Sequence, residues 1–173
     1  MIVTVEEALE AIGQEVDETA LTRKIKAVES AIRDYTNNNF QQRAVQFRAS
    51  TSNHYIKAAN EYLQVGDNIQ ISRSHNQGVY TIMEISDQGI RVNDRLYDCP
   101  SNLITKVEYP PAVQEGVLNL LKWDYNNRDK VGIKSETISR HSVTYYDQDN
   151  NNQLMGYPVS LIGFLDPYIL PVF

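Results

Sequence analysis

The stretch VGDNIQISRSHNQGVYTIMEISDQGIRV, residues 65–92, decides the fold because apolar and polar residues alternate along most of it. Alternation with a period of two is typical of half-buried β-strands. Turn-forming residues at Gly66-Asp67 and at Asn76–Gly78 divide the stretch into short strands. Similar segments lie on both sides of it, HYIKA at residues 54–58 and NLITKVEY at residues 102–109. Short strands at roughly ten-residue spacing predict a small antiparallel β-barrel.

Helical signals precede this β region. Thr4 followed by Glu7 forms a capping box, and Gly13 predicts a left-handed end to the first helix. Asp17 is a candidate N-cap for a second helix, whose apolar residues recur at alternating spacings of four and three. These residues are Leu21, Ile25, Val28, Ile32 and Tyr35. Such a stripe predicts a helix that packs against a partner.

A further helix is predicted after the β region. Pro111 can occupy its first turn, where the missing N–H costs little, and NNRDKVG at residues 126–132 ends the helix. One face of this helix carries Val113, Val117, Leu120, Leu121 and Asp124. We expect the helices that flank the β region to pack together, since neither has another apolar partner.

These elements predict an α+β fold: a small helical bundle interrupted by an inserted antiparallel β-barrel and followed by an extended C-terminal tail. We expect residues 1–43 and 108–134 to form the helical body, residues 44–107 the barrel and residues 135–173 the tail. The strand pattern of the barrel resembles that of small SH3-like barrels. Within the tail, a short helix is expected to begin at Pro158.

The tail starts with SETISRHSVTYYD, residues 135–147, which alternates like a strand but loads neither face with aliphatic residues. Such a strand gains much from main-chain hydrogen bonds and buries little, so we expect residues 135–146 to pair with β-structure of a neighbouring chain. The terminal YILPVF, residues 168–173, is apolar enough to need cover and short enough to dock, so we expect residues 167–173 to anchor to another chain. The interaction candidates are Ile138, Arg140, His141, Val143, Tyr145, Tyr146, Tyr168, Ile169, Val172 and Phe173.

Composition argues against several classes of function. The net charge is −6 and no segment concentrates basic residues. Both facts argue against a protein that binds the phosphate backbone of nucleic acids. No run of about 18 apolar residues is present, so no membrane span is predicted. The single cysteine, Cys99, cannot form an internal disulfide and fits a reducing compartment.

Catalytic and metal-binding patterns are weak. Ser139 and His141 would lie about 7 Å apart on one extended strand, too far for a direct hydrogen bond between nucleophile and base. Asp147 completes the residue types of a hydrolase triad, but no G-x-S-x-G turn is present. His54, His75 and His141 lack further ligands at metal-binding spacing, and no glycine-rich phosphate loop occurs. We therefore predict no catalytic residue, no metal and no cofactor.

Three segments together resemble the head–tail connector proteins of tailed bacteriophages, also called head-completion or adaptor proteins. They are VEEALEAIG…LTRKIKAVESAIRDYTNNNF, PPAVQEGVLNLLKWDYNN and GIKSETISRHSVTYYD…GYPVSLIGFLDPY. The last segment is the most specific, and the three cover the helical body and the tail. The β region departs from the shortest members of the family and resembles the longer ones.

The resemblance implies a structural protein of the virion neck, made in the cytoplasm of the bacterial host. About twelve copies are expected to form a ring below the portal protein, which extends the DNA channel, helps retain packaged DNA and docks the next protein. The implied partners are other copies of the chain, the portal, a downstream neck or tail-completion protein, and DNA that passes without sequence-specific binding. Neither an enzymatic activity nor a membrane is implied.

The sequence by itself leaves two other classes of function as alternatives. A nucleic-acid-binding module that uses the inserted barrel predicts salt-sensitive affinity for DNA, although the charges of residues 54–107 nearly balance. A hydrolase that uses Ser139 and His141 predicts turnover that is lost on His141→Ala.

Overall fold

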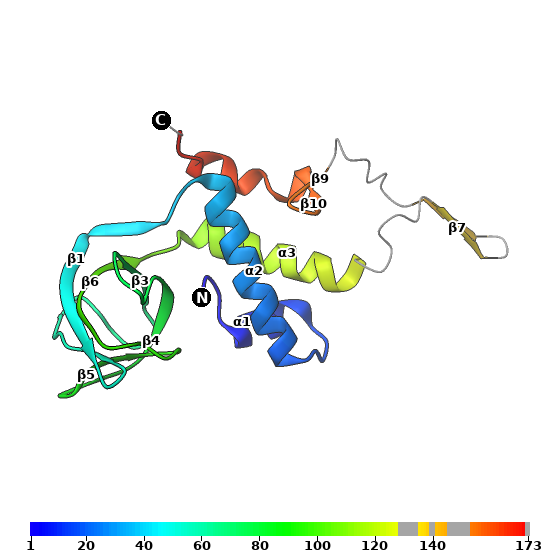
Figure 1. Cartoon of the computed structure of the whole chain (residues 1–173). Coiled ribbons are helices and arrows are strands. Elements are labelled where there is room, and N and C mark those ends of the chain that lie inside the picture. Colours follow the sequence, from blue (N-terminus) through cyan, green and yellow to red (C-terminus); the bar gives the residue numbers. More distant parts are fainter. Residues whose placement is uncertain (128–134, 139–140, 145–152, 172–173) are drawn as a thin grey trace. The chain divides into compact units, whose positions relative to one another are not determined.

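The structure is a computed structural model of mixed α+β class, shown in Figure 1. It describes residues 1–127, 135–138, 141–144 and 153–171. The chain divides into two compact units. The closed-sheet unit comprises Met1 and residues 38–109, and the helical unit comprises residues 2–37 and 110–173.

The closed-sheet unit is a six-stranded antiparallel sheet. Its strands are β1 (Gln41–Ser52), β2 (Tyr55–Ile56), β3 (Asn68–Ser72), β4 (Gly78–Ser86), β5 (Gly89–Val92) and β6 (Cys99–Val107). The hydrogen-bonded order is β1-β2-β5-β4-β3-β6, and β6 pairs with both β3 and β1. The sheet therefore closes on itself, and every strand in it has two neighbours.

Aliphatic residues at alternate positions fill the interior of the closed sheet. On β3, Ile69 and Ile71 are fully buried, whereas the alternating Asn68, Gln70 and Ser72 are half-buried. On β4, Ile82 is fully buried and Ile85 is exposed, and the register with β5 shifts between Ile82 and Glu84. The buried core consists of Ala49, Ile56, Leu63, Ile69, Ile71, Ile82, Ile90, Val92, Leu96 and Ile104. The strands predicted within residues 65–92 are thus confirmed.

The strands before residue 65 differ from the sequence interpretation. The expected strand at residues 54–58 is reduced to β2, because Asn53 and His54 form the turn from β1, with φ values of 53° and 69°. β1 begins before the expected start of the β region at residue 44, and three residues between Gln42 and Gln46 fall outside its register with β6. This irregularity hides the alternation in the first half of β1.

A cluster of hydrogen-bonded polar side chains is buried in the closed-sheet unit. The Asn76 amide donates to Thr51 Oγ1 at 3.1 Å and to the Tyr97 carbonyl at 2.8 Å. The Asn102 amide donates to the Ala49 carbonyl at 3.1 Å and to Thr51 Oγ1 at 3.3 Å. Asn76 is 2% exposed and Asn102 is fully buried. Because buried amides need partners, these bonds fix how β1 lies against β6.

The helical unit contains the three predicted α-helices. They are α1 (Val5–Ile12), α2 (Glu18–Thr36) and α3 (Pro111–Asn127). The capping box is present, since Glu7 N–H donates to Thr4 Oγ1 at 3.1 Å and Thr4 N–H donates to Glu7 Oε2 at 2.8 Å. Gly13 caps α1 with a φ of 71°, and Asp17 caps α2. These predicted helix ends are confirmed, as is the start of α3 at Pro111.

The C-terminal region is not one extended tail. Its described residues form β7 (Ser135–Ile138), β8 (His141–Thr144), β9 (Gln153–Leu154), β10 (Tyr157–Pro158) and the 3-10 helices η3 (Val159–Leu161) and η4 (Gly163–Tyr168). The helix expected from Pro158 is therefore two consecutive 3-10 helices. Tyr157, Ile162 and Leu165 are buried, because this segment covers apolar residues of the helical unit. After η4 the chain is extended again at Ile169.

Segments far apart in the sequence share the core of the helical unit. α1 contacts α2 and α3, and η4 contacts both α2 and α3 (Figure 1). Tyr35, at the end of the predicted α2 stripe, is only half-buried, and the neighbouring Thr36 is fully buried. The buried apolar residues are Ile2, Val3, Ala8, Ile12, Leu21, Ile25, Val28, Ile32, Val113, Val117, Leu120, Leu121, Tyr157, Ile162 and Leu165.

Candidate functional site

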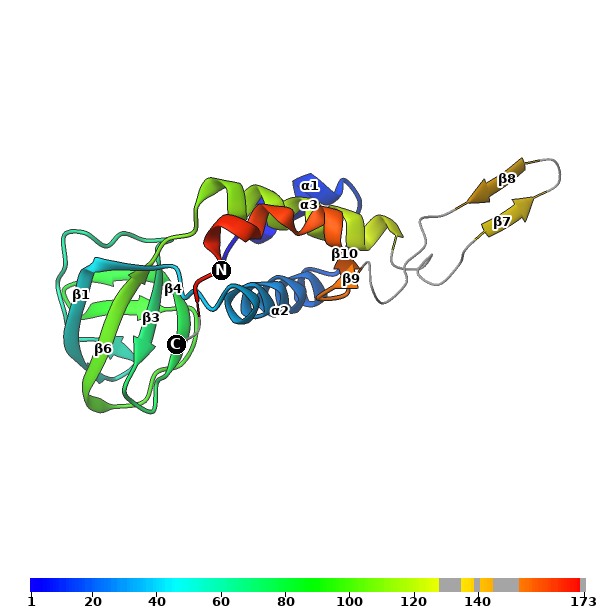
Figure 2. The same cartoon turned by 90° about the horizontal axis from the view of Figure 1, so that it is seen from above.

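The predicted interaction strand is a hairpin. β7 pairs antiparallel with β8, as Figure 2 shows, with Ile138 opposite His141 and Glu136 opposite Val143. The expectation of one continuous strand over residues 135–146 is therefore wrong, because two parts of the stretch pair with each other. Within the described residues, β7 and β8 have no other strand partner. Each strand consequently has one edge whose backbone groups are available for another strand.

Some of the predicted residues lie outside the part of the chain that the structure describes. Among the interaction candidates these are Arg140, Tyr145, Tyr146, Val172 and Phe173. Of the three residue types of a hydrolase triad, Ser139 and Asp147 also lie outside it, and only His141 is described.

The described end of the chain presents two exposed apolar side chains. Ile169 is 42% exposed and Leu170 is 46% exposed, whereas Tyr168 at the end of η4 is half-buried. Leu170 N–H donates to the carbonyl of Thr36, the last residue of α2, at 2.8 Å. This bond holds the backbone in place and leaves both side chains exposed. We call residues 169–171 the C-terminal segment.

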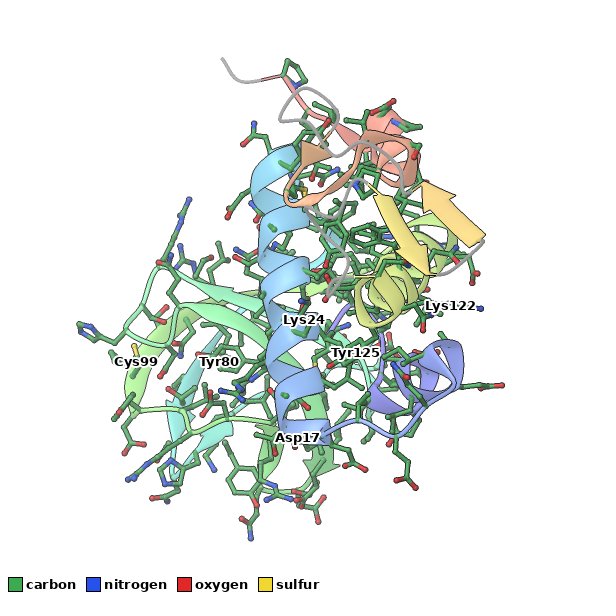
Figure 3. All side chains as sticks on the ribbon, turned by 90° about the vertical axis from the view of Figure 1, so that its right-hand side faces the viewer. Asp17, Lys24, Tyr80, Cys99, Lys122 and Tyr125 are labelled. Atoms are coloured by element: carbon green, nitrogen blue, oxygen red, sulfur yellow. The ribbon has the colours of Figure 1, made fainter. Side chains whose placement is uncertain are left out.

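A groove of about 660 Å³ lies between α3 and the 3-10 helices η3 and η4. Its apolar lining consists of Ala112, Gly116, Trp123, Leu161 and Phe164. Its polar lining consists of Glu115, Asn119, Lys122, Asn126, Asn127 and Ser160. Figure 3 labels Lys122 on α3. We call this feature the α3 groove.

Aromatic rings build the floor of the α3 groove. A β-carbon at Gly116 would lie 2.4 Å from Phe164 Cε2, so the Phe164 ring packs directly on the α3 backbone. The rings of Trp123 and Tyr157 pack edge to face, with centroids 5.8 Å apart. Sequence reasoning missed this groove. The available signal is Gly116 itself, because a glycine inside an apolar helix marks a close approach of another group.

An ion pair joins α2 to α3. Lys24 Nζ contacts Asp124 Oδ2, and the Asp124 side chain is only 5% exposed. Burial, and after it the carboxylates of Asp124 and Asp17, raise the pKa of the neighbouring Tyr125 above its usual value. Figure 3 labels Lys24, Tyr125 and Asp17 on the helical unit. The pair links the two helices that flank the β region, but both helices also contact α1 and η4, so the expectation that neither has another apolar partner is wrong.

The closed-sheet unit has an open groove of its own, of about 730 Å³. Its lining consists of His54, Met83, Arg91, Val92, Asn93, Asp94 and Arg95. Arg91 Nε donates to Glu84 at 3.0 Å, and Asp94 is adjacent in sequence to Arg95. His54 Nδ1–H donates to the Leu96 carbonyl at 2.7 Å. The basic side chains of this groove are thus accompanied by carboxylates, and positive charge is not concentrated.

Charge is divided unevenly between the two units. The closed-sheet unit has as many acidic as basic residues, so the whole net charge of −6 belongs to the helical unit. Among the described residues, no group of three or more His, Cys, Asp or Glu side chains could hold a metal ion. What the arrangement offers chemically is strand edges, an exposed apolar segment and a groove.

No helix in the described ranges has both the length and the apolar character that crossing a membrane requires. Comparison with known proteins gives no family for the chain. No protein-family model matches the sequence, and a search of curated proteins finds no match.

Proposed function

We propose that the chain is a structural protein of the neck of a tailed bacteriophage. About twelve copies form a ring below the portal protein, extend the DNA channel, help retain packaged DNA and dock the tail or the next neck protein. The closed-sheet unit is then a small SH3-like barrel inserted into the helical body. In this proposal the β7–β8 hairpin and the C-terminal segment contact neighbouring subunits or the portal.

The β7–β8 hairpin is the observation that carries this proposal. Its two strands pair only with each other within the described residues. A two-stranded hairpin is marginally stable by itself in water, so it gains from pairing or packing with another structure. Strand addition to a neighbouring chain supplies main-chain hydrogen bonds to the free edges. A ring offers such a neighbour to every copy.

The distribution of charge supports a passage for DNA. The helical unit carries the net negative charge of the chain, and the closed-sheet unit is balanced. A wall of negative charge repels the phosphate backbone, so DNA can slide past it without being held. We therefore assign the wall of the channel to the helical unit.

Replacement of the hairpin tests the proposal. A Gly/Ser linker in place of residues 135–144 should leave thermal unfolding of the chain unchanged and should abolish rings in electron micrographs of phage necks. Ser142→Thr, which places a strand-forming residue in β8 and keeps the hydroxyl group, is the matched control and should form normal rings. Normal rings from the linker variant would contradict the assigned role of the hairpin. If the control also forms no rings, the connector function itself is wrong.

A DNA-binding role of the closed-sheet unit is the alternative function, and the groove containing His54, Arg91 and Arg95 is the observation in its favour. Titration of the whole chain with duplex DNA distinguishes DNA binding from the connector function. Affinity that falls steeply with salt and weakens on Arg95→Ala would support DNA binding. The connector proposal predicts weak affinity that Arg95→Ala leaves unchanged.

A further inference from the structure

The helical unit carries two features that match each other chemically. One is the α3 groove, with an aromatic floor and a polar rim. The other is the C-terminal segment, whose Ile169 and Leu170 side chains are exposed although they are apolar. The segment is not part of the groove lining.

We propose that the C-terminal segment of one copy docks in the α3 groove of a neighbouring copy. This inference rests on the proposed ring and identifies one contact between its subunits. The groove and the segment are different surfaces of one chain, so the contact is heterologous. Heterologous contacts generate closed rings when the rotation between copies closes, and open filaments when it does not.

The floor of the groove suits apolar side chains. Trp123 and Phe164 are both half-buried, so part of each ring remains accessible to a ligand. Ligand sites in proteins are commonly apolar and aromatic, with a few polar groups that fix orientation. Insertion of Ile169 and Leu170 would remove their exposed surface from water together with that of the two rings.

The rim of the groove suits an extended backbone. Asn119 and Asn126 are exposed on α3, and each amide offers two donors and an acceptor. The C-terminal segment starts in an extended conformation, with φ −71° and ψ 120° at Ile169. An extended segment turns peptide groups outward, where side-chain amides can bind them. Amides on a groove wall therefore favour a peptide over a compact apolar molecule.

One charged residue near the segment can pair with one on the rim of the groove. The rim of the α3 groove carries one base, Lys122, and one acid, Glu115, so its charge is balanced. Asp166 lies in η4, close to the C-terminal segment in the sequence. Lys122 and Asp166 are exposed, and neither takes part in an ion pair within the described ranges. Docking with Asp166 beside Lys122 would give each of them a partner of opposite charge.

The contact has to come from another copy because the segment is held elsewhere in its own chain. Leu170 N–H is bonded to the Thr36 carbonyl, which keeps the segment at the C-terminal end of α2. The same bond fixes the backbone before association, so less conformational freedom is lost on docking than for an unanchored tail.

Trp123 provides a direct measurement, since it is the only tryptophan in the chain and it lines the groove. A synthetic peptide of residues 166–171 is titrated into the full chain while the tryptophan emission is recorded. We expect a saturable shift of the emission to shorter wavelength. A peptide with Asp in place of both Ile169 and Leu170 should cause no such shift.

Charge reversal makes the test specific. A peptide with Asp166→Lys should bind the native chain roughly five- to tenfold more weakly, because an attractive pair becomes a repulsive one. The same peptide should regain affinity for the Lys122→Glu chain. Lys122 is exposed on α3, so circular dichroism should show that this variant folds normally.

The outcomes separate the contact from the function. A saturable shift that follows the charge reversals supports the contact. Either no saturable shift, or equal binding of the native and the doubly acidic peptides, overturns it. Peptide binding requires no ring, so failed binding with normal rings in phage necks overturns the contact alone. Binding without any rings in the necks overturns the connector function alone.

Discussion

The ring of Phe164 rests on the backbone of Gly116, since an added β-carbon would lie 2.4 Å from Cε2 and 2.5 Å from Cδ2 of the ring. This contact ties η4 to α3 and forms part of the floor of the α3 groove. A glycine inside a helix costs about 1 kcal/mol relative to alanine, so a close approach is the physical reason to keep it there.

Gly116→Ala should destabilise the chain by roughly 1–3 kcal/mol, because Phe164 must move and overpacking outweighs the gain in helix propensity. Urea unfolding measures the effect. Asn119→Ala, at an exposed position of the same helix, is the control and should change stability by less than about 0.5 kcal/mol. Equal stability of Gly116→Ala and the native chain would show that the ring is not held against the helix.

The ion pair between Lys24 and Asp124 should respond unequally to removal of its two members. Lys24→Met leaves a carboxylate that is 5% exposed without its cation and should cost about 1–3 kcal/mol, less than a fully buried pair because Lys24 reaches solvent. Asp124→Asn should cost less, since the remaining ammonium group can be hydrated. Urea unfolding of both variants checks the order, and a larger loss for Asp124→Asn would contradict it.

The elements that the sequence predicted well are those set by neighbouring residues. Thr4 and Glu7 cap α1 through bonds within one turn, and Ile69 and Ile71 show the β period within one strand. The single strand expected over residues 135–146 failed for a different reason. Side chains alternate with the same period in one long strand and in the two strands of a hairpin. The pattern of residues therefore does not reveal that Ile138 pairs with His141.

The α3 groove could not be predicted because its parts lie far apart in the sequence. Gly116 and Trp123 belong to α3, whereas Leu161 and Phe164 follow after the hairpin region. The apolar pattern of residues 157–168 indicates that these residues need cover, but not which helix supplies it. Their burial against α2 and α3 is a property of the folded unit.

The buried amides of the closed-sheet unit should be sensitive to substitution. Asn102→Leu removes the donor to the Ala49 carbonyl and an acceptor for the Asn76 amide, and unpaired buried groups of this kind cost about 1–3 kcal/mol each. Thermal unfolding measures the loss. Gln77→Ala, an exposed neighbour of Asn76 in sequence, is the control and should be nearly neutral. A neutral Asn102→Leu would mean that the cluster does not stabilise the sheet.

Tyr125 should make stability depend on pH in the alkaline range. Burial, followed by the carboxylates of Asp124 and Asp17, raises its pKa in the folded chain above the ordinary value of 10.0. The unfolded chain releases this proton first as the pH rises, so the stabilisation is complete below about pH 10 and is lost as the pH passes through the folded pKa. Tyr125→Phe should therefore lose less stability between neutral and alkaline pH than the native chain. Urea unfolding across this range gives both slopes, and equal slopes would contradict the assignment.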